Sequence, residues 1–261
     1  MIEKIVAEWK YDPKEYFEEN IHMIEDKYEL RIGDGEIEAR IDSKFMDNAD
    51  NIINEINDNL KTRFLAEQVM THKPFNLSEP KRYDLRSDGK KNRYLKAKSI
   101  VTKTSIGKAD LIVNNKNGKI ISDTKADRIN KKRWFAETAI KHGKNDPILK
   151  QMLKSYHESV NDPSDELIHL YEIRDAVSDK FSNGKEARKE LNITKGEWNS
   201  LGQLANKEPL LQGRHRGLGA GKLRKAEKFE LEKARQVATK IIENYVAYLE
   251  NENSEQDIKK Q

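Results

Sequence analysis

Several features that direct a protein's chemistry are missing from this 261-residue chain. It contains no cysteine, which excludes disulfides, thiolate zinc sites and cysteine nucleophiles and agrees with a reducing compartment. No apolar run approaches the length needed to cross a bilayer, and residues 1–20 are charged throughout, unlike a signal peptide. We therefore expect a soluble, cytoplasmic protein with no membrane partner.

An excess of one charge is also lacking. The 49 lysines and arginines exceed the 45 aspartates and glutamates by only four, so a basic binding surface would have to be local. Hydrophobic residues make up 36% of the chain, and the aromatic residues number three Trp, nine Tyr and seven Phe. This composition supports a packed core rather than a disordered chain.

Hydrophobic periodicity predicts an α+β fold, with antiparallel hairpins and helices in the N-terminal half and an all-α helical bundle in the C-terminal half. Residues 28–41, YELRIGDGEIEARI, form two alternating runs around a Gly-Asp-Gly turn, which is typical of a hairpin. Apolar residues at helical spacing predict a helix over 49–70. Further strands are expected over 94–101, 109–113 and 119–122, and a helix over 130–141.

The signals after residue 143 are all helical. Two Asp-Pro pairs, at 146–147 and 162–163, each resemble an N-cap followed by proline at the first helical position. Thr194 and Glu197 predict a capping box, and a broad apolar face from Phe229 to Leu249 predicts the last helix. We expect three parts: a mixed domain over 1–143, a helical domain over 144–250 and a frayed polar tail over 251–261.

Two aspartates and a lysine give the clearest indication of catalysis. In GKADLIVNNKNGKIISDTKAD, residues 107–127, Asp110 begins one apolar strand and Asp123 ends the next, with Lys125 two residues further on. Residues two apart on a strand share a face, so the three side chains can lie in one site. Two carboxylates can bind Mg²⁺, while a lysine can orient water or stabilise charge on phosphate.

This pattern resembles the PD-(D/E)XK nucleases over residues 49–141. The resemblance implies that Asp110 and Asp123 are metal ligands for Mg²⁺ and that Lys125 is the catalytic lysine. Glu67, in the helix before the strands, matches the extra acid that many members carry. Asp110 follows Ala109, where the family has proline. The alternative is a solvated hairpin whose polar ends face water.

A second pattern occurs in EARKELNITKGEWNSL, residues 186–201, which resembles the helix-turn-helix of DNA-binding proteins. Asn192 occupies the turn position where glycine is common, and Asn tolerates the left-handed conformation required there. The resemblance implies a recognition helix over 195–206 that presents polar side chains to bases or phosphates: Lys195, Asn199, Ser200 and Gln203. The alternative is two packed helices joined by a capped turn.

A third pattern is LQGRHRGLGAGKLRK, residues 211–225, which we call the basic glycine loop. It has four glycines and no acid, so its backbone can approach a ligand and its arginines can bind phosphate. The candidate anion-binding side chains in it are Arg214, His215, Arg216, Lys222 and Arg224. The alternative is a solvated loop, or one whose arginines pair with acids of the fold.

Three hypotheses remain open. The first is a nucleic-acid-binding protein that binds DNA or RNA through the basic glycine loop. The second is a magnesium-dependent nuclease, and the third is a non-catalytic module whose helical half binds another protein or a second copy of itself. The sequence alone leaves open whether the chain is an enzyme and whether it uses any cofactor.

Overall fold

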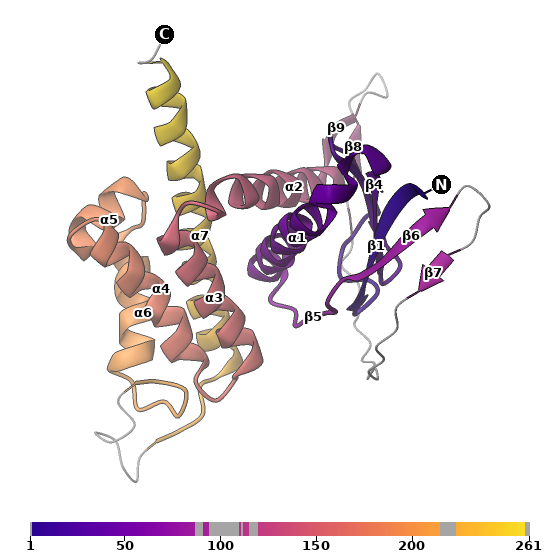
Figure 1. Ribbon diagram of the computed structural model, residues 1–261. Coiled ribbons are helices and arrows are strands. Elements are labelled where there is room, and N and C mark those ends of the chain that lie inside the picture. The colour runs from indigo at the N-terminus through magenta and orange to yellow at the C-terminus, as the bar shows by residue number, and fades with distance from the viewer. Residues whose placement is uncertain are drawn as a thin grey trace. The chain divides into compact units, whose positions relative to one another are not determined.

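The computed structural model describes residues 2–86, 91–93, 110, 112–114, 120–214 and 223–258 (Figure 1). It confirms the α+β class, because antiparallel strands dominate before residue 124 and the elements described after that point are helices. The chain divides into two compact units, residues 1–61 with 75–131 and residues 62–74 with 132–261. No described helix has the length and apolar character needed to span a membrane.

The first unit is built on an antiparallel sheet of seven strands. The order along the sheet is β2, β3, β4, β1, β6, β7, and β5 pairs with the end of β1. The strands are β1 Ile2–Asp12, β2 Ile21–Ile24, β3 Tyr28–Gly33, β4 Glu36–Asp42, β5 Asn76–Leu77, β6 Lys81–Arg86 and β7 Lys91–Arg93.

The predicted hairpin is confirmed as β3 and β4. Its two-residue turn places Asp34 at φ 53° and Gly35 at φ 81°, the left-handed conformation that such turns require. Strand β1, which lies between β4 and β6 in the sheet, was not predicted. From Ala7 to Asp12 its apolar residues alternate with charged ones, and the side chains of Ile5, Ala7 and Trp9 are buried.

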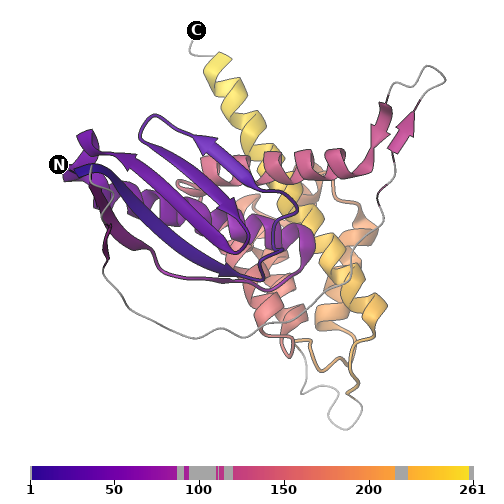
Figure 2. The same cartoon turned by 90° about the vertical axis from the view of Figure 1, so that its right-hand side faces the viewer.

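Helix α1, Ala49–Thr71, confirms the helix predicted over 49–70. In the first unit its apolar residues Ile52, Ile56 and Leu60 are buried, and the Trp9 indole donates a hydrogen bond of 3.0 Å to Asn57 Oδ1. The strands lie in front of this helix in Figure 2. A short 3₁₀ helix, η1 Ser43–Asn48, precedes it.

The later strands of the first unit differ in part from expectation. Strands β8, Ile112–Asn114, and β9, Ile120–Asp123, form a separate two-stranded sheet. The strand expected over 94–101 lies outside the described residues, and β6 was not predicted. Helix α2, Thr124–Gly143, begins earlier than predicted because Asp123 caps it.

The second unit consists of helices around one apolar core. Besides the ends of α1 and α2 it holds α3 Pro147–Asn161, α4 Glu166–Lys180, α5 Gly184–Glu190, α6 Lys195–Asn206 and α7 Lys228–Ile258. The largest fully buried side chains among these helices include Phe135, Tyr156 and Tyr245.

Helix ends in this unit confirm some predictions and correct others. Asp146 caps α3 as expected, accepting a hydrogen bond of 2.6 Å from the Leu149 N–H. The N-cap predicted at Asp162 is wrong, because α4 begins at Glu166 after Asp165. Helix α7 continues to Ile258, and Phe229, expected on its buried face, is 62% exposed.

Candidate functional site

The Asp123 carboxylate belongs to the start of α2. Its Oδ1 accepts hydrogen bonds of 3.0 Å from the main-chain N–H groups of Lys125 and Ala126. These are two of the donors that a helix leaves unsatisfied at its N-terminus, so the carboxylate acts as a helix cap. Asp123, which the nuclease resemblance makes a metal ligand, is thus also the residue that caps α2.

Asp110 is held by an arginine. Arg128 donates to Asp110 Oδ1 at 2.8 Å and also pairs with Glu18 at 2.8 Å, so one guanidinium bridges two carboxylates. The hydrogen bond from Arg128 lowers the pKa of Asp110, and the charge of Lys125 contributes to the same effect. The structure therefore brings Asp110 and Lys125 into one charged cluster with Arg128.

The remaining acid of the nuclease resemblance has a different environment. Glu67 belongs to the second unit, where it is 6% exposed and accepts a hydrogen bond of 2.7 Å from Lys132 Nζ. Across the described ranges, no three His, Cys, Asp or Glu side chains form a group suited to a metal ion.

The helix-turn-helix-like segment has the local geometry that its sequence predicts. Helix α5 ends at Glu190, α6 begins at Lys195, and both helices pack on α4 (Figure 1). Asn192 has φ 48°, the left-handed turn conformation. The five apolar residues of the segment 186–201 are all buried: Ala187, Leu191, Ile193, Trp198 and Leu201.

Helix α6 presents a polar stripe opposite those apolar residues. Lys195, Asn199 and Gln203 are exposed and follow one another at four-residue spacing, which places them on one side of the helix. Within the described part of the chain, Lys195 and Asn199 make no side-chain hydrogen bond or ion pair, and the Gln203 amide donates to Glu208 at 2.8 Å. Ser200 is half-buried and donates to the Glu197 carbonyl.

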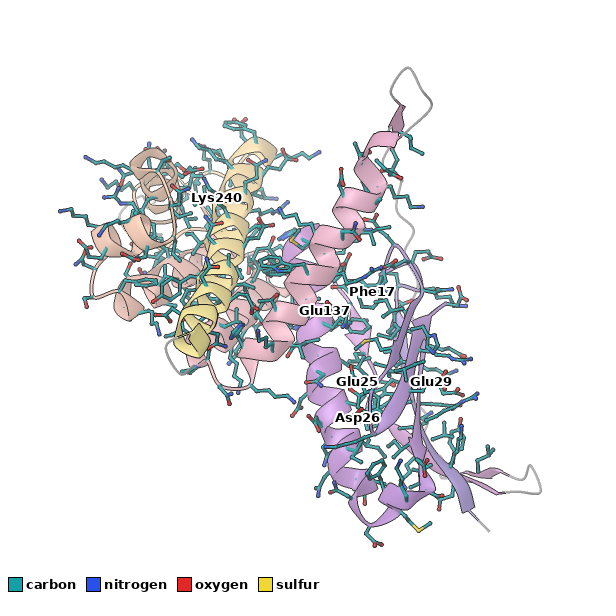
Figure 3. All side chains as sticks on the ribbon, turned by 90° about the horizontal axis from the view of Figure 1, so that it is seen from above. Phe17, Glu25, Asp26, Glu29, Glu137 and Lys240 are labelled. Atoms are coloured by element: carbon teal, nitrogen blue, oxygen red, sulfur yellow. The ribbon has the colours of Figure 1, made fainter. Side chains whose placement is uncertain are left out.

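The acidic residue of α6 is neutralised within the fold. Glu197 completes the predicted capping box with Thr194 and accepts a hydrogen bond of 2.7 Å from Lys240 on α7, which is labelled in Figure 3. These hydrogen bonds, first the one from Lys240, lower the pKa of Glu197 to about 2. The carboxylate therefore stays ionised at neutral pH with a cation beside it.

The two ends of the basic glycine loop are joined by hydrogen bonds. The Leu211 N–H donates to the Arg224 carbonyl, and the Arg224 N–H to the Pro209 carbonyl, each at 2.9 Å. The Arg224 guanidinium binds both oxygens of Glu230 at 2.7 Å, so this arginine pairs with an acid of the fold. The candidates His215, Arg216 and Lys222 lie outside the described residues.

Arg214 is the described loop arginine that faces α4. Its side chain is 42% exposed, lies over the Tyr171 ring at 5.1 Å and pairs with Asp175 at 3.0 Å. Its main-chain N–H donates to the Ala205 carbonyl at the end of α6. A Cβ at Gly213 would meet that same carbonyl oxygen at 2.9 Å, so the close approach requires glycine.

Sequence reasoning missed one residue of this region, Arg174. Its guanidinium lies 4.8 Å from the centre of the Trp198 ring and 4.9 Å from that of Tyr171. Arg174 turns toward α6 and donates to the Trp198 carbonyl. The one signal in the sequence is Gly202, a glycine inside a helical pattern.

Comparison with protein-family models, with curated proteins and with solved structures found no match for this chain.

Proposed function

We propose that this protein binds nucleic acid and that α6 and the basic glycine loop form the binding surface. The observation that carries the proposal is the left-handed Asn192 between α5 and α6, with all five apolar positions buried. This local geometry leaves the opposite side of α6 polar and exposed, as a recognition helix requires.

The chemistry of the exposed stripe suits this function. Asn199 and Gln203 carry amides, which can donate to and accept from base edges. Lys195 can contact a phosphate, and Arg214 adds a second cation beside the end of α6. A helix of 12 residues is about 18 Å long, which is enough to follow a groove across several base pairs.

The other hypotheses have less support. For a magnesium-dependent nuclease, both candidate ligands already have a role in the fold: Asp110 pairs with Arg128, and Asp123 caps α2. For a protein-interaction module, the exposed stripe on α6 offers amides and a lysine rather than an apolar anchor. We propose further that the protein is cytoplasmic, a location in which nucleic acid is accessible to it.

Fluorescence anisotropy tests the proposal directly. Labelled duplex DNA and single-stranded RNA are titrated with the protein at several salt concentrations. The variants are Lys195→Ala with Asn199→Ala, and Arg214→Ala with Arg216→Ala. Lys154→Ala is the matched control, since this exposed lysine lies on α3, away from α6 in the sequence.

We expect micromolar or tighter binding that weakens steeply with salt, because phosphate contacts release counterions. Each lost phosphate contact lowers the slope of log affinity against log salt by about 1, so both double variants should flatten it. Lys154→Ala should behave as wild type. Absence of binding to either nucleic acid at low salt would contradict the proposal. Cleavage on adding Mg²⁺ that Asp123→Ala abolishes would instead favour the nuclease.

A further inference from the structure

Arg174 is a half-buried cation that the described fold leaves without a counter-ion. Its guanidinium lies against the Tyr171 and Trp198 rings, and its one hydrogen bond runs from Nη1 to the Trp198 carbonyl at 3.3 Å. Its Nε is buried and has no hydrogen-bond partner among the described residues. A guanidinium has five N–H donors, and only one of those of Arg174 donates to a described protein atom.

Gly202 leaves space for this guanidinium. A Cβ at this position of α6 would overlap Arg174 Nη1 and lie 3.3 Å from its Cζ. Glycine lowers helix stability more than any residue except proline, and Gly202 is buried inside α6. The helix thus carries a destabilising residue at a point where the Arg174 side chain lies against it.

Arg214 contacts the same ring as this arginine, and Asn206 lies one turn beyond Gly202 on α6. Arg214 stacks over the same Tyr171 ring, and its partner Asp175 is 46% exposed, so that ion pair is weakly held and can exchange. Asn206 follows Gly202 by one helical turn on the same face of α6. Its Oδ1 is buried and unpartnered within the described ranges.

We propose that the junction of α4 and α6 is a phosphate-binding site in which Arg174 and Arg214 together hold one phosphate group. Each guanidinium can donate two parallel N–H bonds to phosphate oxygens. Two arginines and Asp175 together carry a single positive charge, which matches the single negative charge of a phosphodiester.

This inference deepens the proposed function, because the assignment of the phosphate to a nucleic acid rests on it. A free nucleotide or inorganic phosphate offers the same chemistry. The probes are therefore inorganic phosphate, a dinucleoside monophosphate with a single phosphodiester, and a labelled 12-nucleotide RNA, each titrated into the full chain by calorimetry or anisotropy.

Gly202→Ala is the sharpest variant. It keeps every charge, adds one methyl group where the guanidinium lies, and improves the helix propensity of α6. We expect it to weaken binding of the dinucleotide at least tenfold while the protein stays folded. Asp175→Asn frees Arg214 and should strengthen the same binding several-fold, and Lys154→Ala should change nothing. If Gly202→Ala fails to fold, the gain expected for Asp175→Asn decides the question.

The results separate this site from the surface on α6. Lys195→Ala with Asn199→Ala should weaken RNA binding more than it weakens dinucleotide binding. RNA binding that is the same in wild type, Gly202→Ala and Asp175→Asn would overturn the phosphate site and leave the proposed function standing. Saturable binding of inorganic phosphate or a nucleotide without any RNA binding would keep the site but overturn the assignment to nucleic acid. No saturable binding of any probe would overturn both.

Discussion

Two arginines in the helical unit differ in whether a carboxylate binds them. Arg235 on α7 donates to both oxygens of Glu166, at 2.6 and 2.9 Å, and that carboxylate is only 2% exposed. Arg174 on α4 has two aromatic rings and one carbonyl around it, and in the described part of the chain no carboxylate binds it. Both side chains are partly buried, but only the first has its charge neutralised.

This difference separates a charge that belongs to the fold from a charge that is available to a ligand. A buried carboxylate is tolerated when a cation meets it with good geometry, as Arg235 does for Glu166. Charges of the first unit are also paired within the fold. Arg128 forms an ion pair with Asp110, and Asp123 accepts hydrogen bonds from the N-terminus of α2. A charged side chain that already has a partner in the fold is a weaker candidate for binding a ligand, whatever motif it belongs to.

Removing the carboxylate from the paired arginine should have the largest effect. Glu166→Gln leaves Arg235 in its partly buried position without a counter-ion, so we expect the free energy of unfolding to fall by about 4 kcal/mol. Urea denaturation followed by circular dichroism measures this. Glu137→Gln is the control, since Glu137 is exposed on α2 (Figure 3). A loss below about 1 kcal/mol would show that the pair is not structural.

The paired arginine should also make stability depend on pH through His72. Burial, and secondly the charge of Arg235, lower the pKa of His72 to about 4. Glu166 lies 3.8 Å from the ring, but Arg235 already engages both of its oxygens. Because the unfolded chain protonates this histidine near pH 6.5, its contribution to stability is present above that pH and lost as pH falls toward 4.

The expected size of this loss is up to about 3 kcal/mol between pH 6.5 and 4. His72→Asn isolates it, since Asn tolerates the φ of 53° at this position and does not titrate. The difference in unfolding free energy between the two proteins should shrink as pH falls through this window. A constant difference would contradict the assignment.

A carboxylate introduced near Arg174 should neutralise its charge, as Glu166 does for Arg235. Asn206→Asp places a carboxylate one turn beyond Gly202, on the side of α6 that faces Arg174. We expect it to stabilise the fold by about 0.5–1 kcal/mol, as a partly exposed ion pair does, and to weaken phosphate binding. Thermal unfolding and the dinucleotide titration report the two effects. Tighter phosphate binding in this variant would contradict the site.

Removing the unpaired arginine should have the smallest effect on stability. Arg174→Met keeps a long apolar side chain against Trp198 and removes a charge that no described carboxylate neutralises. The lost cation–π contact and the relief of the unpaired charge oppose each other, so unfolding free energy should change by less than about 1 kcal/mol. A loss comparable to that of Glu166→Gln would mean that Arg174 is a structural residue.

Local patterns in the sequence predict much of this architecture. The Asp34-Gly35 turn, the Thr194–Glu197 capping box and the left-handed Asn192 each depend on neighbouring residues, and all three are confirmed. Strand β1 was missed because its partners, β4 and β6, are far away in sequence. The Asp162 cap was wrong because α4 starts three residues later than the pattern indicates.

The candidate site shows the same limit. The exposure of Lys195 and Asn199 follows from helical spacing alone, and sequence reasoning found both. The setting of Arg174 depends on packing between α4 and α6, which no spacing rule contains. The pairing of Arg224 with Glu230 agrees with the alternative that loop arginines bind acids of the fold.

The most direct test is to record the side-chain Nε–H resonances of the arginines by NMR while a dinucleoside monophosphate is added. The account predicts a saturable shift of the Arg174 resonance, absent in Gly202→Ala, while the Arg235 resonance stays in place because Glu166 already holds it. Equal shifts of the two arginines, or no shift of Arg174, would contradict the claim that Arg174, unlike Arg235, is available to a phosphate.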